Sequence, residues 1–158
     1  MLQLFKKRMM IQSPVSGRIV RLDDVNDPVF SGRAVGDGCA VIPEDNFICS
    51  PCDGKIVQII DTNHAFCILS DDGLEILVHI GLDTVKLKGM GFKRLKDEGA
   101  RVKAGDSVME VDLQYLQSQK KEIVTPVLIT NMDKVGNLQI SRGNVRTGDR
   151  LMSLCLLY

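Results

Sequence analysis

The sequence has no tryptophan, and only two tyrosines and two histidines occur among its 158 residues. Its 20 basic residues equal its 20 acidic residues, so neither charge is in surplus. A nucleic-acid-binding protein needs a basic surplus on one face, and nucleic acid is therefore not an expected partner. No apolar run approaches the roughly 20 residues of a membrane-spanning helix. We therefore expect a globular protein with at most peripheral membrane association.

The first ten residues contain a basic trio but no long apolar region after it, so they do not form a secretory signal. We expect a short N-terminal tail over residues 1–10. The remainder, residues 11–158, is of a length that fits a single domain with its own core.

Five cysteines, an odd number, in a chain without an export signal indicate reduced thiols and a cytoplasmic location. Two of them form the sequence C-S-P-C at Cys49–Cys52. A zinc knuckle needs a second pair of ligands at matching spacing, and a redox motif needs a helix after its second cysteine. The sequence has no such pair, and the residues after Cys52 resemble a strand. We therefore expect buried thiols at Cys39, Cys49, Cys52, Cys67 and Cys155.

Short runs rich in valine, isoleucine and leucine recur along the chain, separated by glycine, proline, aspartate and asparagine. This pattern predicts an all-β protein, an antiparallel β-sandwich or barrel. The main predicted helix is Asp112–Ile123, and a shorter helical turn is expected near residues 92–99. The predicted strands are residues 17–22, 39–42, 54–60, 64–70, 74–80, 83–87, 106–112, 127–132 and 138–141.

Two segments of the sequence resemble each other. Ser13–Leu22 (SPVSGRIVRL) and Ser50–Ile59 (SPCDGKIVQI) share five of ten positions, which favours a duplicated β unit over generic turn chemistry. Residues 102–111 (VKAGDSVMEV) resemble pieces of biotinyl and lipoyl carrier domains and point to a barrel–sandwich hybrid. A swinging-arm carrier is nevertheless disfavoured, because the expected hairpin tip at Asp72–Gly73 carries no lysine.

Both histidines lie within one predicted hairpin, where Asp72–Gly73 is a strong signal for a two-residue turn. In that register Phe66 faces His79 and His64 faces Gly81. Residues two apart on a strand share a face, so the two imidazoles would be diagonal neighbours with backbones roughly 7–8 Å apart. A three-residue loop would instead place them on opposite faces.

Two neighbouring imidazoles have three interpretations. They can be a hydrogen-bonded pair at a strand edge, or two ligands of a metal site that needs further ligands from Asp27, Asp83, Glu75 or a partner. In the third, one neutral ring nitrogen attacks a phosphoryl group while the other imidazole donates to its oxygens. Thr62 could then fix the tautomer of His64.

The segment Thr62–Phe92 resembles the glucose-type enzyme IIA of the bacterial phosphoenolpyruvate-dependent sugar phosphotransferase system. The flanking segments SPVSGRIV, DPVFSGRAVGDG, EGARVKAGD and TPVLITNMD resemble that family in the same order. The resemblance covers residues 11–148. It implies an antiparallel β-sandwich that carries phosphoryl groups and requires no cofactor, although His64 and His79 could share zinc with a partner in a regulatory complex. A metal-binding or regulatory interaction module that uses the His64/His79 pair without phosphoryl transfer is the alternative.

The resemblance also implies roles for individual residues. His79 is the phosphoryl acceptor, His64 its stabiliser, and Thr62 the residue that supports His64. The donor is the histidine-containing phosphocarrier protein, and the acceptor is a cysteine on the enzyme IIB domain of a sugar permease. The sugar stays open among glucose, N-acetylglucosamine, β-glucosides and disaccharides.

A hydrophobic rim around the histidines is expected to contact these partners. Gly81 would let the chain turn beside His79, and its carbonyl could hold one ring nitrogen. Met90 departs from the glutamate found in many relatives, and residues 151–158 are unusually apolar, which indicates a docked final strand or a domain beside a permease. The expected rim is Val29, Phe30, Val35, Phe66, Leu77 and Val85, with Asp27 and Asp83 beside it.

Overall fold

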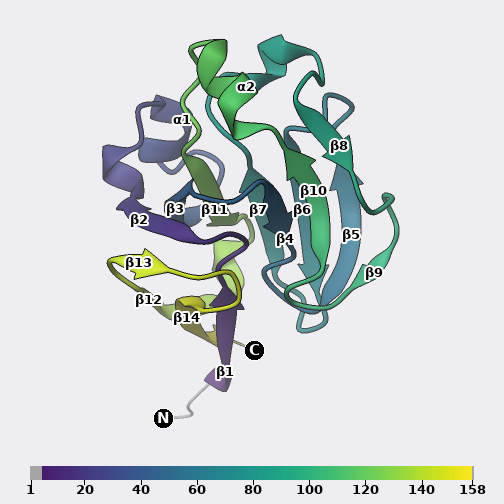
Figure 1. The fold of residues 1–158 in the computed structure, drawn as a ribbon. Helices are drawn as coiled ribbons and strands as arrows, with labels where there is room; N and C mark the ends of the chain where they lie inside the picture. Colours follow the sequence, from purple (N-terminus) through teal and green to yellow (C-terminus); the bar gives the residue numbers. More distant parts are fainter. Residues whose placement is uncertain (1–4, 158) are drawn as a thin grey trace.

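The strands of the molecule pair antiparallel throughout residues 5–157, the part of the chain that this computed structural model describes. They form three sheets (Figure 1). The largest contains, in spatial order, β13 (Asn144–Val145), β2 (Gly17–Arg21), β3 (Asp37–Pro43), β11 (Thr125–Ile129), β7 (Glu75–His79), β6 (Ala65–Ser70), β5 (Gly54–Ile59) and β9 (Arg101–Val102). The two smaller sheets are β1 (Phe5–Gln12), β14 (Arg150–Leu157) and β12 (Val135–Ile140), and β4 (Phe47–Cys49), β10 (Ser107–Val111) and β8 (Phe92–Arg94).

Two hydrophobic clusters lie on opposite faces of the large sheet, because strand residues alternate between faces. Val127 and Ile129 of β11 belong to the larger cluster, which includes residues of both small sheets. Leu128, between them, belongs to the smaller cluster. The smaller cluster is covered by the helical segments η1 (Leu22–Asp24) and α1 (Pro28–Ser31). The predicted all-β fold is confirmed.

The main predicted helix is present but shorter than expected. Helix α2 spans Leu113–Ser118, and the Asp112 carboxylate caps it by accepting a hydrogen bond from the Tyr115 backbone at 2.9 Å. The helix ends before Lys120, whose left-handed φ of 61° cannot continue it. Residues 92–99 form strand β8 and a turn instead of a helical turn.

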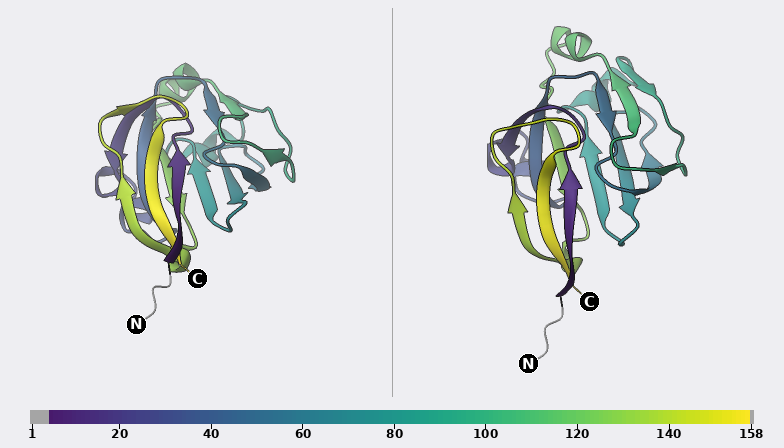
Figure 2. Two further views of the ribbon diagram at one scale, coloured as in Figure 1. Left: turned by 90° about the horizontal axis from the view of Figure 1, so that it is seen from below. Right: turned by 60° about the horizontal axis from the view of Figure 1, so that its bottom comes forward.

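Two further expectations are wrong. Residues 83–87 were expected as a strand but form the 3-10 helix η2 (Thr84–Leu87), because Asp83 and Lys88 at its ends have left-handed φ values of 60° and 54°. The expected tail over residues 1–10 is a strand from Phe5 onward, paired with β14 along its length, and residues 1–4 lie outside the described residues. Figure 2 shows β1 in purple beside β14 in yellow. This pairing packs the apolar C-terminal segment, as strand β14, against β1.

The duplicated β motif is confirmed by reciprocal backbone hydrogen bonds. The Gln12 amide donates to the Pro51 carbonyl at 2.9 Å, and the Cys49 amide donates to the Pro14 carbonyl at 2.8 Å. Within each repeat the buried serine hydroxyl donates to the carbonyl two residues later, at 2.7 Å in both cases. The two segments are therefore equivalent in structure and face each other.

The repeat extends to a second pair of segments within the chain, residues 102–111 and 145–154. This second pair was not predicted from the sequence. Each begins with a tight turn in which an aspartate side chain accepts from the amide three residues earlier, Asp106 from Lys103 and Asp149 from Arg146, both at 2.9 Å. The short strands β9 and β13 directly precede these turns and pair with β5 and β2, respectively. The shared signal in the sequence is Gly-Asp followed by an apolar strand.

Glycine is required at equivalent positions of the two repeats. A Cβ on Gly54 would lie 2.2 Å from the Leu69 carbonyl oxygen, and one on Gly17 would lie 1.9 Å from the Ile42 carbonyl oxygen. We expect Gly54→Ala to lower the free energy of unfolding by about 3 kcal/mol in urea titrations, because backbone must move. Gly136→Ala is the matched control, since its Cβ would approach closely only the end of the Leu157 side chain, at 3.0 Å, while the nearest backbone atom, the Cys155 carbonyl oxygen, lies at an ordinary contact distance of 3.8 Å. Equal losses in both variants would contradict the interpretation.

Candidate functional site

The hairpin that carries the histidines pairs β6 with β7, and its register differs from the prediction by one residue. Ala65, and not Phe66, lies opposite His79. The loop has three residues, because the Ser70 amide donates to the Leu74 carbonyl at 2.8 Å. Only Gly73 in this loop has a left-handed φ, 94°, as in three-residue loops, whereas the predicted turn needs positive φ at two residues.

The two imidazoles nevertheless meet, with ring centroids 4.9 Å apart and planes at 76°. The expectation that a three-residue loop separates them is wrong because strict alternation applies only inside a strand. His64 precedes β6 and follows Asn63, whose φ of 63° is left-handed. His79 is the last residue of β7. Both rings therefore lie where the strand geometry ends.

Each ring has one hydrogen-bonded Nδ1 atom. His79 Nδ1 lies 2.8 Å from the Gly81 carbonyl oxygen. A carbonyl only accepts, so Nδ1 carries the hydrogen and Nε2 keeps its lone pair. His64 Nδ1 lies 2.7 Å from the Thr62 hydroxyl oxygen. When that hydroxyl donates, His64 carries its hydrogen on Nε2 and becomes a donor. The predicted contacts of Gly81 and Thr62 are confirmed.

Position 81 requires glycine for two reasons, its backbone conformation and the lack of space for a side chain. Its φ is 75°, which favours glycine. A Cβ there would also lie 2.7 Å from Thr84 Cγ2 and 2.9 Å from the Glu122 carbonyl oxygen. The Thr84 side chain cannot move easily, because its hydroxyl donates to the Ile80 carbonyl at 2.7 Å. This packing holds the Gly81 carbonyl beside His79.

Burial keeps both rings neutral at pH 7. His64 is 4% exposed, and burial, with a smaller effect of His79, lowers its pKa to about 4. Burial also lowers the pKa of the partly exposed His79, while the Gly81 carbonyl and the charge of Asp27 partly oppose that shift. A neutral imidazole is the form that can attack phosphorus.

The expected rim divides into three groups. Val29 and Val85 are 47% and 49% exposed and are free to contact another molecule. Phe30 is buried, with its ring centroid 4.9 Å from that of His79 and the planes at 58°. The other two aliphatic members are partly buried and pack against the smaller hydrophobic cluster: Val35 and Leu77.

Phe66 was wrongly assigned to the rim. It is 1% exposed and lies in the larger cluster, because the true register turns its side chain to the inner face of the sheet. Two exposed apolar residues near Thr62 were missed instead. Ile60 is 39% exposed and lies two residues before Thr62, and Met90 is 62% exposed and follows Gly89, whose Cβ position is 3.8 Å from the Thr62 carbonyl. The sequence contained one indication that Ile60 and Met90 belong to the rim: both are apolar residues next to predicted turns.

The two carboxylates assigned to the rim differ in their contacts. Asp27 caps α1, where its side chain accepts a hydrogen bond from the Val29 amide at 3.0 Å. Asp83 is exposed and pairs with Lys86 at 3.0 Å and Lys121 at 3.4 Å. Their contact with basic residues of a partner stays a prediction.

The structure offers little to a metal ion by itself. Within residues 5–157, no three histidine, cysteine, aspartate or glutamate side chains form a group that could hold one. Zinc shared by His64 and His79 with a partner's ligand stays a prediction. All five cysteines are free, and burial raises the pKa of Cys52 to about 12, so the C-S-P-C segment does not supply a reactive thiolate there.

Comparison with known proteins identifies the family to which this chain belongs. Residues 9–135 match the family described as phosphoenolpyruvate-dependent sugar phosphotransferase system, EIIA 1. The chain belongs to this family. It is therefore a phosphocarrier component of a sugar phosphotransferase system, and a phosphotransferase by activity, with partners that deliver and accept phosphoryl groups.

Individual EIIA proteins support this assignment. The chain is 47% identical over 142 residues to the glucose-specific EIIA component of Haemophilus influenzae, covering 90% of this chain and 86% of that protein. It is 47% identical over 137 residues to the N-acetylglucosamine-specific EIICBA component of Escherichia coli, covering 86% of this chain. There it spans only 21% of the relative's length.

A solved EIIA structure has the same fold. The glucose permease IIA of Mycoplasma capricolum superposes with a TM-score of 0.89 at 38% identity, covering 96% of this chain and 99% of that one. No helix among residues 5–157 is both long enough and apolar enough to cross a membrane.

The pKa of His64 can be tested directly. Its Cε1 proton should titrate near pH 4 in NMR spectra, well below the ordinary 6.5. Between these values the unfolded chain binds the proton and the folded chain does not, so this residue makes stability rise with pH across that window and fall as pH drops. We expect His64→Gln to flatten the rise in urea titrations. A His64 midpoint at or above pH 6.5 would exclude the proposed burial effect.

Proposed function

We propose that His79 accepts a phosphoryl group on Nε2 from the histidine-containing phosphocarrier protein and passes it to a cysteine on the enzyme IIB domain of a sugar permease. Sugar uptake is thereby coupled to sugar phosphorylation. The observation that carries the proposal is the 2.8 Å contact between His79 Nδ1 and the Gly81 carbonyl, which leaves Nε2 as the nucleophilic atom. The five unpaired thiols support a cytoplasmic location.

The transfer balances without any other reagent. In the first step the Nε2 lone pair of His79 forms a bond to phosphorus while the donor's nitrogen–phosphorus bond breaks and its electrons return to the donor. In the second step the thiolate of the acceptor attacks phosphorus, and the bond to Nε2 breaks. The Gly81 carbonyl holds the Nδ1 hydrogen throughout and stabilises the positive charge that the phosphorylated ring gains.

His64 stabilises the transferring group as a neutral donor. With Thr62 donating to Nδ1, the Nε2 hydrogen of His64 is available to the phosphoryl oxygens. The low pKa of His64 keeps this ring uncharged, so it does not repel a positive charge on His79. Asp27, which acts on His79 by its charge, is engaged by the Val29 amide and is therefore poorly suited to activate water.

The exposed apolar residues around the histidines support protein docking. Val29 and Val85 are each close to half exposed, and Ile60 and Met90 add apolar surface beside Thr62. Exposed apolar groups gathered at one site mark protein interaction surfaces. One surface of this kind can serve donor and acceptor in turn, because the donor brings its phosphoryl group to Nε2 of His79 and the acceptor brings its thiolate to the phosphorus bonded there.

The residue roles can be tested by phosphorylation from phosphoenolpyruvate with the general enzyme I and the phosphocarrier protein. We expect His79→Gln to take no label. His64→Gln should accept label but pass it to the acceptor at least about 100-fold more slowly, because a donor to the transferring group is lost. Thr62→Val should show a weaker form of the same defect, and Thr62→Ser should retain activity. Label on the His79→Gln protein would disprove the assignment.

Docking is tested separately with Val29→Asp and Val85→Asp. A charge in the apolar surface should raise the KM for the phosphocarrier protein about tenfold with little change in kcat, since only binding is impaired. Phe47→Asp is the matched control, because Phe47 is 48% exposed on β4 of a different sheet. A similar rise in KM for the control would show that the effect is not specific to this surface.

A further inference from the structure

Helix α1 supplies Phe30, whose ring packs on the imidazole of His79. The helix nevertheless spans only four residues, Pro28–Ser31. A single helical turn is not stable by itself, because nucleation costs more than its few hydrogen bonds return. Its N-terminus is capped by Asp27. Phe30 anchors it in the smaller hydrophobic cluster. Its position relative to His79 therefore depends on what holds its C-terminal end.

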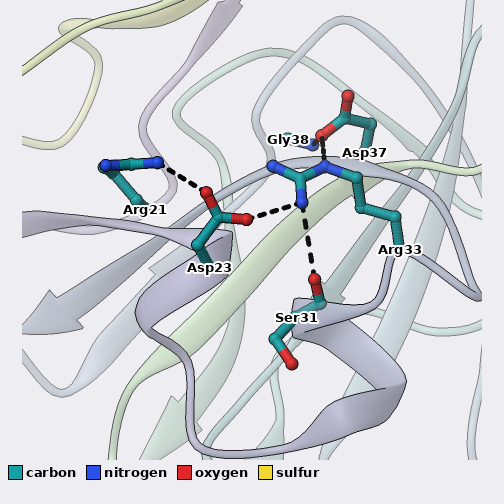
Figure 3. A network of polar contacts seen from close by, with 6 residues as sticks. All are labelled: Arg21, Asp23, Ser31, Arg33, Asp37 and Gly38. Carbon is teal, nitrogen blue, oxygen red and sulfur yellow. Dashed lines mark hydrogen bonds and ion pairs between the residues drawn. The ribbon is translucent and has the colours of Figure 1, made fainter.

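Arg33 holds that end through three contacts (Figure 3). Its guanidinium donates to the Asp23 carboxylate at 2.7 Å, to the Asp37 carboxylate at 3.0 Å and to the Ser31 carbonyl at 3.4 Å. Asp23 belongs to η1, Ser31 ends α1, and Asp37 begins β3. One side chain thus joins the C-terminal end of the short helix to two other segments, η1 and β3.

The backbone at Arg33 supports the same conclusion. Its φ of 57° is left-handed, a conformation that non-glycine residues with long side chains seldom adopt. Its backbone amide donates to the Phe30 carbonyl at 3.0 Å. The turn that contains Arg33 is therefore hydrogen-bonded directly to the residue that packs on His79. Glycine would fit the backbone better, which indicates that the side-chain contacts offset the strain.

The flanking charges form one network and not three separate pairs. Asp23 also accepts from Arg21 at 2.5 Å, and Asp37 accepts from the Gly38 amide at 2.8 Å. These hydrogen bonds help to fix the orientation of the two carboxylates that accept from Arg33. A planar guanidinium can satisfy such divergent acceptors at once, whereas a lysine ammonium presents a point charge.

We propose that Arg33 is a positioning residue: by joining η1, α1 and β3 it holds the Phe30 ring against His79 and so orients the imidazole for phosphoryl transfer. This inference rests on the proposed role of His79. It assigns Arg33 no contact with the phosphoryl group. Its effect is transmitted through Phe30, whose ring centroid lies 4.9 Å from that of His79.

The test uses two variants of Arg33. Arg33→Gly removes the strain of the left-handed φ but also the side-chain hydrogen bonds. Arg33→Lys keeps the positive charge but loses the planar guanidinium that donates to both carboxylates. Arg101→Lys is the control, because Arg101 is also an exposed arginine paired with a carboxylate, Asp71 at 2.6 Å, but lies beside the first residues of β5, outside the η1–α1–β3 network. Each variant is first examined without phosphorylation, by the NMR shift of the His79 Cε1 proton, which senses the Phe30 ring.

We expect the His79 signal to move in both Arg33 variants and not in Arg101→Lys. The kcat for transfer should fall about tenfold in Arg33→Gly, because a displaced nucleophile loses its attack geometry. His79 should titrate at higher pH in that variant, since burial lowers its pKa and a displaced Phe30 ring leaves the imidazole more exposed. The titratable groups facing it, His64 and Asp27, are unchanged.

An unchanged His79 signal and kcat in Arg33→Gly would overturn the proposal, as would equal changes in Arg101→Lys. Failure of the proposed function gives a different result. The wild-type protein would then take no label on His79, while the NMR comparison would still report whether Arg33 controls the ring.

Discussion

The hydrogen bond between His79 Nδ1 and the Gly81 carbonyl is the constraint on which the site depends. It selects the tautomer, and the tautomer decides which nitrogen can attack. The surrounding packing maintains it: Gly81 needs its left-handed φ, and Thr84 and the Glu122 carbonyl leave no room for a side chain.

The repeated β units flank the strands that carry the site. In the eight-stranded sheet, β2 with β13 and β5 with β9 come from the two copies and lie at opposite ends. Strands β6 and β7, which carry the histidines, lie between them. The copies therefore support the site from both sides, while the residues that perform the chemistry come from the hairpin and from the short segments around it.

The sequence was sufficient for what depends on local pattern. Alternation and turn residues indicated the β fold and the Ser-Pro repeat. The meeting of His64 with His79 was predicted from a two-residue loop, and the structure brings the rings together in a different register. Register was beyond it, because the choice between a two-residue and a three-residue loop rests on the Ser70–Leu74 contact. That one-residue difference moves Phe66 into the core. The Arg33 network was also hidden, since its partners Asp23 and Asp37 come together only in the folded chain.

The most direct test of the account is to identify the phosphorylated atom itself. The wild-type protein, uniformly labelled with ¹⁵N and phosphorylated through the phosphocarrier protein, can be examined by ¹⁵N NMR with phosphorus coupling. The account predicts a single phosphohistidine, bonded through Nε2 of His79, with Nδ1 still protonated. Phosphorus on Nδ1 of His79, or on His64, would contradict the role assigned to the Gly81 carbonyl.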